Sequence, residues 1–239
     1  MKKLIFGIGV FTLVSGVIAV VSIIKLSDSQ AQKVTSHNKT GISSSLLNPS
    51  SISVLVNKQH PLNPLTYTPN DLVVPNIPLR TNITSDEKMV SAVIAPSLEA
   101  MVMAAKNQGV SINLQSGYRS YSIQAKLYNE YVQEQGQAVA DTQSARAGYS
   151  EHQTGLAVDL GDSTVPNCDV HDCFATTPAG EWLAANAYKY GFILRYPANT
   201  QNVTGYTYEP WHYRYIGTQV ALAMHNKNVS TLEQYFNLN

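Results

Sequence analysis

The sequence predicts an α+β fold in which helices flank a small, mainly antiparallel sheet. Short apolar runs with the length of strands alternate with longer segments of helical periodicity from about residue 52 to the end of the chain. The 239 residues suffice for one sizeable core plus terminal segments, and no internal repeat is apparent. We therefore expect a single domain over residues 52–239.

Composition limits the classes of function. Charged residues make up 13% of the chain, and 16 basic residues balance 16 acidic ones. A nucleic-acid-binding surface needs an excess of lysine and arginine. We expect no nucleic-acid partner, and we expect the chain to act as a monomer.

The N-terminus predicts export. Lys2 and Lys3 precede an uncharged apolar run from Leu4 to Ile24. Its length favours a single-pass membrane anchor, because the apolar core of a signal peptide is usually ~7–15 residues long. Ser29-Gln30-Ala31 still resembles a cleavage site, so residues 1–31 are predicted to be a membrane anchor or a signal peptide. Both alternatives place the rest of the chain on the outer side of the cytoplasmic membrane.

The segment between export signal and domain differs in composition from both. Residues 32–51 are rich in Ser, Asn, Thr and Lys, which predicts a flexible linker. Residues 52–56 favour a strand, and the prolines that follow favour an extended segment. A helix is predicted from the capping box Thr84-x-x-Glu87 to Gly109, with a kink at Pro96.

Local signals place the remaining elements. Three strands are predicted from apolar runs, namely residues 112–115, 156–160 and 192–196. Three helices are predicted from their ends: one capped by Ser120 and ended by Gly136, one capped by Thr177 before Pro178 and ended by Gly191, and a short one capped by Ser230. Residues 204–215, rich in aromatics, predict a hairpin or strand pair.

Two cysteines, Cys168 and Cys173, lie close together in a loop-like stretch. In an exported protein such a pair favours a small disulfide loop. The alternative is a metal site with His171, for which two cysteines and one histidine without a second cluster are a weak signal.

The stretch from Ser150 to Asp159 holds the first candidate site residues. His152 and Asp159 stand seven residues apart, separated by Gly155 and an apolar run. A carboxylate that closes an apolar run is expensive to bury without a positive partner. Positions seven apart face opposite sides of an unbroken strand, so these two residues can share a metal only if a loop ends at Gly155.

The stretch Glu209-Pro210-Trp211-His212 offers a second histidine and a spare carboxylate. Two imidazoles and one carboxylate make a three-ligand zinc set with a fourth position left for water, and a further glutamate supplies the base that such a site needs. Pro210 favours a bulge or irregular turn, which would let Glu209 and His212 face one site. Together these residues predict a zinc hydrolase.

Four motifs add a family resemblance. They are Tyr118-Arg119-Ser120 with Gln124, Ser150-x-His152-x-x-Gly155-x-Ala157-x-Asp159, Tyr190-Gly191-Phe192 with Arg195-Tyr196-Pro197, and Thr204-Gly205-Tyr206-x-Tyr208-Glu209-Pro210-Trp211-His212-Tyr213-Arg214-Tyr215. They resemble the VanY-like D-alanyl-D-alanine carboxypeptidases, part of a wider zinc group with lysostaphin-type peptidases and the hedgehog domain. The likeness extends over nearly the whole exported part. It departs at Ala147-Gly148, where the family often has Pro-Gly.

The resemblance implies a role for each candidate residue. The zinc ligands would be His152, Asp159 and His212; Glu209 would be the general base; Arg119 would stabilise the oxyanion; Gln124 and Ser150 would bind the terminal D-residue and its carboxylate. From the residues alone, Gln124 fits a solvated helix position equally well, and Ser150 fits a turn or cap hydroxyl.

The implied reaction is removal of the C-terminal D-alanine from peptidoglycan stem peptides, at a D,D- or L,D-bond. The alternative is an exported, non-catalytic peptidoglycan-binding module of the same fold. Glu209 argues against this alternative, because a non-catalytic metal site needs ligands but no base.

Overall fold

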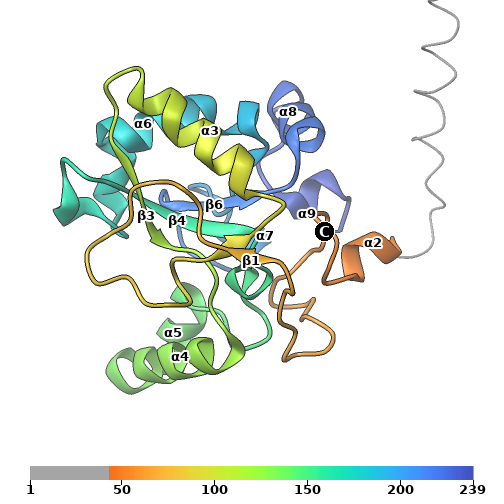
Figure 1. Cartoon of the computed structure of the whole chain (residues 1–239). Helices are drawn as coiled ribbons and strands as arrows, with labels where there is room; N and C mark the ends of the chain where they lie inside the picture. The colour runs from red at the N-terminus through yellow and green to blue at the C-terminus, as the bar shows by residue number, and fades with distance from the viewer. Residues whose placement is uncertain (1–42, 239) are drawn as a thin grey trace, which may run out of the picture. The chain divides into compact units, whose positions relative to one another are not determined.

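A four-stranded antiparallel sheet forms the centre of the domain (Figure 1). The computed structural model describes residues 43–238, so the predicted membrane anchor and most of the predicted linker lie outside the described residues. The sheet has the order β3-β4-β6-β5. Its strands are β3 (Ile112–Ser116), β4 (Ala157–Asp162), β5 (Phe192–Leu194) and β6 (His212–Tyr215), and a separate ribbon pairs β1 (Leu72–Val73) with β2 (Val90–Ser91).

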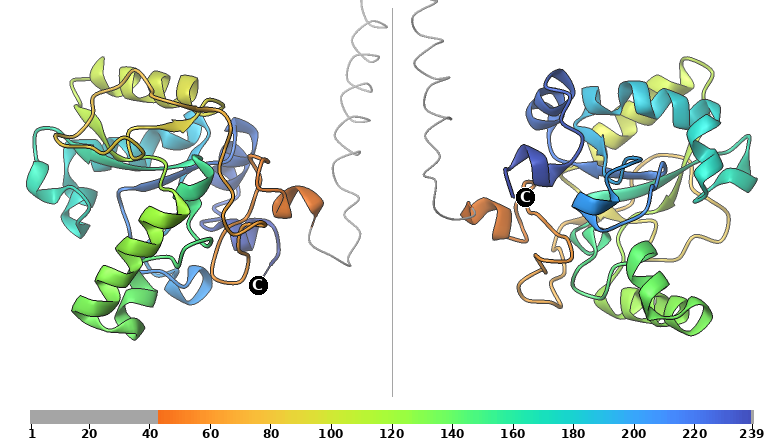
Figure 2. Two further views of the ribbon diagram at one scale, coloured as in Figure 1. Left: turned by 60° about the horizontal axis from the view of Figure 1, so that its bottom comes forward. Right: turned by 180° about the vertical axis from the view of Figure 1, so that it is seen from behind.

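Helices lie on both sides of this sheet, which confirms the predicted fold class. Figures 1 and 2 show α3 and α6 on one side and the pair α4–α5 on the other. The helices are α2 (Ser44–Leu47), α3 (Ala95–Lys106), α4 (Tyr121–Gln135), α5 (Gln137–Gln143), α6 (Pro178–Asn186), α7 (Gln201–Thr204), α8 (Thr218–Asn226) and α9 (Leu232–Tyr235).

Side-chain alternation gives the sheet one apolar face and one polar face. Leu114 of β3, Val158 of β4 and Tyr213 of β6 join the main hydrophobic core together with residues of α3 and α6. The neighbours of these residues along each strand face the other way. Asp159 and His212 therefore lie on the polar face, where the candidate metal site described below is found.

Several local predictions are confirmed. The strands expected at residues 112–115, 156–160 and 192–196 form as β3, β4 and β5. The helix α4 ends at Gly136, which has φ +82°, and Thr177 caps α6 by accepting a hydrogen bond from Gly180 N at 3.1 Å. The last helix is capped by Thr231, one residue beyond the predicted Ser230.

The helix predicted from Thr84 begins only at Ala95. The reciprocal capping contacts do form, with Glu87 N donating to Thr84 Oγ1 at 3.2 Å, but they close a turn before β2. Pro96 sits in the first turn of α3, where its missing N–H costs no hydrogen bond. The expected kink is therefore absent from this position.

Two predicted strands are wrong. Within residues 204–215 only β6 is a strand, preceded by α7 and a loop. Residues 52–56 form no strand although Val54, Leu55 and Val56 are buried. Their backbone finds a different partner, because Arg214 Nη2 donates to the carbonyl oxygens of Ile52 and Val54 at 2.9 and 2.7 Å.

The C-terminal end of the predicted linker belongs to the domain. Residues 44–47 form α2, and Leu46 is buried in a second hydrophobic cluster with Ile216, Met224 and Leu232. Leu55 N donates a hydrogen bond to Leu46 O at 2.9 Å. The domain thus begins before residue 52, because Leu46 contributes apolar surface to its core.

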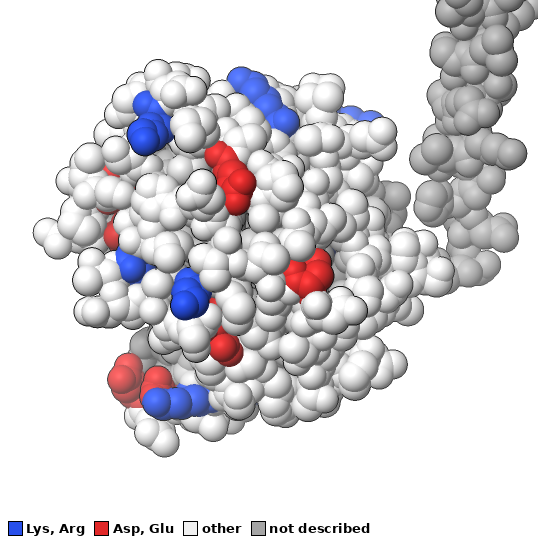
Figure 3. All heavy atoms as spheres, viewed as in Figure 1, with Lys and Arg blue, Asp and Glu red and all other residues white. Residues whose placement is uncertain are grey.

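Within residues 43–238, no helix combines the length and apolarity needed to cross a membrane. Charged side chains are scattered over the face shown in Figure 3, and neither sign gathers into a continuous patch there.

Candidate metal centre

His152 reaches the site from a short 3₁₀ helix, η2 (Glu151–Thr154), that precedes β4. Gly155 ends this helix at φ +69°, a conformation that favours glycine, and a Cβ there would lie 2.8 Å from Ser91 N. The loop demanded by the seven-residue spacing therefore exists, and it turns His152 toward Asp159.

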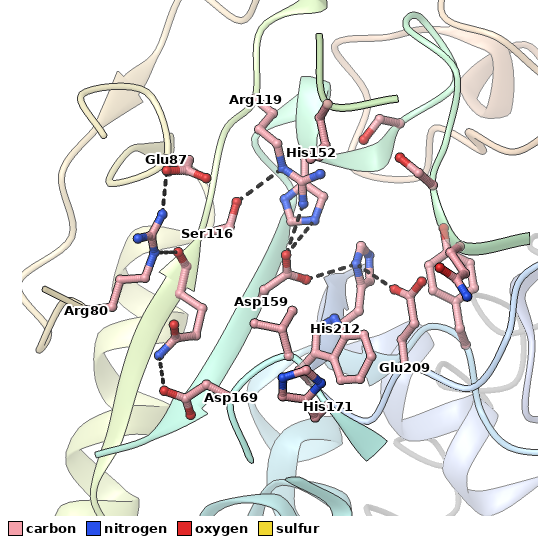
Figure 4. Close-up of a pocket in the computed structure, with 18 of the residues that line it drawn as sticks. Arg80, Glu87, Ser116, Arg119, His152, Asp159, Asp169, His171, Glu209 and His212 are labelled. Carbon is pink, nitrogen blue, oxygen red and sulfur yellow. Dashed lines mark hydrogen bonds and ion pairs between the residues drawn. The ribbon is translucent and has the colours of Figure 1, made fainter. Parts of the chain in front are cut away.

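Asp159 stands at the centre of the site, between the two histidines (Figure 4). Its Oδ2 lies 3.2 Å from His152 Nε2, and its Oδ1 lies 3.2 Å from His212 Nδ1. Asp159 and His212 are directly paired across β4 and β6, which brings residues 53 positions apart into contact. The two imidazole rings meet edge to face, with centroids 4.9 Å apart.

These three side chains fit a divalent metal ion. One ligand atom from each lies within 4.8 Å of the others, and all three residues are buried. His152 Nε2 and Asp159 Oδ1 are buried without a hydrogen-bond partner, despite the short contacts, and a buried polar atom left unpaired is costly. A cation would satisfy both atoms, and two histidines with one carboxylate make a known type of ligand set for catalytic zinc.

The nitrogen of each histidine that faces away from Asp159 has a partner of its own. His152 Nδ1 lies 2.6 Å from Gly117 O, and His212 Nε2 lies 3.5 Å from Glu151 Oε2. Such contacts to the second nitrogen fix the tautomer and orientation of metal-binding histidines. The nitrogens left for a metal are therefore Nε2 of His152 and Nδ1 of His212.

Charges within the site influence protonation in the metal-free protein. Burial favours the neutral acid, yet the two histidines hold the pKa of Asp159 well below its usual range. Burial also disfavours charge on His212, but the carboxylates of Asp159 and Glu151 raise the pKa of His212 to about 9. A metal ion that binds His212 must displace this proton.

Glu209 lies at the edge of the ligand set. Its Oε2 is 3.7 Å from His212 Nδ1, and a turn closed by His212 N and Glu209 O at 3.2 Å brings both residues to the same side. The predicted irregular geometry around Pro210 is therefore present. Burial raises the pKa of Glu209 to about 7, which places it in the range of a general base.

Arg119 lies beside His152 and contacts the same oxygen of Asp159 as that histidine does (Figure 4). Its Nη2 donates to Asp159 Oδ2 at 3.0 Å and its Nη1 to Gln124 Oε1 at 3.1 Å. Gln124 is almost fully buried and donates through Nε2 to Ala145 O at 2.7 Å. Gln124 thus holds Arg119 in place, whereas Ser150 lines the groove and makes no cap hydrogen bond to η2.

The site opens into a groove with a volume of about 1510 Å³. One wall includes Gln124, Tyr131 and Ser144 from the side of α4 and α5. The lining also includes residues 169–172, a segment closed by a disulfide between Cys168 and Cys173. Within the part of the chain that the structure describes, His152, Asp159 and His212 form the one candidate metal-binding cluster, and the cysteines pair with each other and not with His171.

A buried ion-pair network behind the site was not predicted. Glu151 Oε1 accepts from Arg195 Nε and Arg214 Nη1, both at 2.8 Å, and Arg195 makes a bidentate pair with Glu233. Both arginine side chains are fully buried. The sequence did carry a signal for this network. Arg195 directly follows the apolar run of β5, as Asp159 lies within the apolar run of β4, and a buried charge of either sign needs a partner of opposite charge.

Comparisons with known proteins assign this arrangement to a family. The family model described as VanY, D-alanyl-D-alanine carboxypeptidase, matches residues 87–218. YodJ of Bacillus subtilis is 41% identical over 189 residues, which are 79% of this chain and 68% of YodJ. The chain belongs to the VanY family of carboxypeptidases.

Two solved structures show that the VanY-family likeness extends to the fold. The LdcB LD-carboxypeptidase is 40% identical and superposes with a TM-score of 0.73. The superposition covers 79% of this chain and 87% of LdcB. The second structure is a VanY D,D-pentapeptidase from a VanB-type resistance cassette, solved in complex with Zn(II). It is 33% identical and superposes with a TM-score of 0.62, over 78% of this chain and 98% of the VanY chain. The predicted family and enzyme class, a carboxypeptidase, are confirmed.

Proposed function

We propose that this protein is a zinc-dependent carboxypeptidase that removes the C-terminal D-alanine from peptidoglycan stem peptides. The observation that carries the proposal is the convergence of the buried side chains of His152, Asp159 and His212. Two of their candidate ligand atoms, His152 Nε2 and Asp159 Oδ1, have no hydrogen-bond partner, and Glu209 lies beside them. The Zn(II)-bound VanY structure supports zinc as the metal, and the family description supports D-alanine as the leaving residue.

Zinc held by the three ligands would supply a Lewis acid and a means of activating water. Glu209 then acts as the base that accepts a proton from the attacking water and as the acid that delivers it to the departing amine. Its burial suits both steps, because burial raises the pKa of Glu209 above the ordinary value and so opposes the lowering of that pKa by a bound cation.

Arg119 provides the fixed positive charge. Its hydrogen bonds to Asp159, Gln124 and Ser116 Oγ hold the guanidinium before substrate arrives. A charge positioned in this way stabilises an oxyanion that develops only in the transition state. We assign Gln124 to positioning Arg119, because its amide is committed within the protein, and Ser150 to contact with the terminal residue in the groove.

The L,D bond of a tetrapeptide stem is our preferred scissile bond. The support for this preference is the TM-score, which is higher for LdcB, an LD-carboxypeptidase, than for the VanY D,D-pentapeptidase. We also propose export, with residues 1–31 as anchor or signal peptide, and action as a monomer. Export agrees with a substrate in the cell wall.

The test is incubation of the purified full-length protein with tetrapeptide and pentapeptide stems, with products identified by mass. Loss of one D-alanine from the tetrapeptide, abolished by chelation and restored by Zn²⁺, is the expected result. Activity on the pentapeptide alone would overturn the bond preference, and activity unaffected by chelation would overturn the role of the metal.

A further inference from the structure

Glu151 is placed to act on a metal ligand and not merely to neutralise charge. It precedes His152 in η2, but its side chain is buried and turned toward His212. Both arginine contacts fall on one carboxylate oxygen, Oε1, which leaves Oε2 directed at His212 Nε2 at 3.5 Å. The two oxygens therefore have different partners, one cationic and one on the metal ligand.

We infer that Glu151 is a positioning residue that sets the tautomer and orientation of His212. This inference rests on the proposed zinc site. An imidazole that donates its Nε2 proton to Glu151 keeps the Nδ1 lone pair free, and Nδ1 is the atom that faces Asp159. Carboxylate partners of this kind also raise the basicity of a metal-bound histidine.

The rigidity of Glu151 comes from the network behind it. Arg195 reaches Glu233 on α9 through two bonds of 2.7 and 3.0 Å, and Arg214 reaches the backbone of Ile52 and Val54. Two buried cations and two buried anions balance one another, so the group lacks net charge. Segments from both ends of the domain thus hold the carboxylate that faces His212.

Glu151→Gln separates the pairing with the arginines from the contact with His212. The two arginines are donors, so they keep the amide oxygen and turn the amide NH₂ toward His212. A donor facing Nε2 favours the tautomer with the proton on Nδ1, the wrong nitrogen for the metal. We expect the dissociation constant for zinc to rise about 10–100-fold, the usual effect of losing such a partner.

Glu233→Gln is the matched control. It removes one negative charge from the same network, but Glu233 contacts Arg195 and Asn57 and does not touch His212. A purely structural role for Glu151 predicts that both variants lose stability and that both keep the zinc affinity of the wild type. The positioning role predicts that only Glu151→Gln loses zinc affinity.

The measurements are chelator competition for Zn²⁺ and proton NMR of the Co²⁺-substituted full-length protein. Cobalt shifts the exchangeable N–H protons of its histidine ligands away from other signals. We expect slow exchange with solvent for His152 Nδ1–H, held by Gly117 O, and for His212 Nε2–H, held by Glu151. In Glu151→Gln only the His212 signal should be lost, and the His152 signal serves as the internal control.

Glu151→Asp covers the case in which Glu151→Gln does not fold. It keeps the negative charge for the arginines, but the shorter side chain withdraws from His212, so the same losses are expected. Rapid exchange of the His212 proton in the wild type, or variants at Glu151 that bind zinc as tightly as Glu233→Gln, would overturn the inference. A wild-type protein that bound no zinc would instead overturn the proposed function.

Discussion

Asp159 and His212 are paired residues on neighbouring strands, and Asp159 Oδ1 lies 3.2 Å from His212 Nδ1. The register of β4 and β6 therefore places two of the three candidate metal ligands side by side in the sheet. A slip of one residue would send one side chain to the apolar face, because side chains alternate along a strand. The core contacts of Val158 and Tyr213 oppose such a slip and so protect the site.

Replacement of Glu209 by glutamine should abolish most turnover and leave the metal in place. The amide keeps the shape of the side chain but cannot accept a proton, and general acid–base catalysis typically contributes ~10²–10⁴-fold in rate. Release of D-alanine and the zinc content of the same sample are the measurements. Glu134→Gln, on the exposed surface of α4, is the control. Normal turnover by Glu209→Gln with zinc bound would show that the base is another group.

Activity should fall on the acid side of neutrality. Burial raises the pKa of Glu209 to about 7 in the metal-free protein, and a bound cation lowers it. Protonated Glu209 cannot act as a base, so kcat/KM should decline below a midpoint at or below about pH 7. The measurement is kcat/KM against pH with saturating zinc. A profile that stays level through the acid range would contradict this prediction.

Arg119→Lys should lower kcat/KM by about 10²–10³-fold, as expected for loss of one preorganised donor to an oxyanion. Lysine keeps the charge but cannot contact Ser116, Gln124 and Asp159 together, so it is held less firmly. Zinc binding should persist, because Arg119 is not a ligand. Arg146→Lys, which alters an exposed pair with Asp141, is the control. Equal losses in both variants would argue against a specific role for Arg119.

Acid should destabilise the domain through the buried network. Burial opposes ionisation, but the paired arginines hold the pKa values of Glu151 and Glu233 below the ordinary value of 4.5. A depressed pKa contributes stability that is present above the unfolded value and is lost as pH falls. The free energy of unfolding, measured with urea, should therefore decrease below about pH 4.5.

Glu233→Gln tests the source of this acid sensitivity. Removing one partner of a buried pair costs about 3–5 kcal/mol at neutral pH. The variant should also show a shallower loss of stability in acid, because one of the two depressed carboxyl groups is gone. An acid dependence as steep as in the wild type would assign the sensitivity to other groups.

The disulfide should matter for stability more than for metal binding. Converting both Cys168 and Cys173 to serine frees a short loop, which lowers the free energy of unfolding by about 2 kcal/mol on the chain-entropy model. None of the three candidate zinc ligands lies within residues 168–173, so the zinc affinity should be unchanged. Thermal unfolding and chelator competition are the measurements. A large loss of zinc affinity would show that residues 168–173 shape the ligand set.

The sequence by itself determined most of the local elements, and it predicted the three side chains that the structure brings together in the candidate metal site. Asp159 stands out because it interrupts an apolar strand, and Gly155 marks the turn that brings His152 beside it. The ends of α4 and α6 follow from Gly136 and Thr177, because capping depends on residues close in sequence. The predicted helix from Thr84 is wrong because its capping box closes only a turn. The residues that follow the turn, Val90 and Ser91, pair with β1 as a strand.

Only the tertiary structure decided which atoms of these residues face the site. The choice of Nε2 for His152 and Nδ1 for His212 depends on Gly117 O and Glu151, which come from other segments. The partners of Glu151 lie 44 and 63 residues further along the chain. A sequence can show that a buried charge needs an opposite charge, but packing in three dimensions selects the partner, because the desolvation penalty is relieved only by groups that come within hydrogen-bond distance.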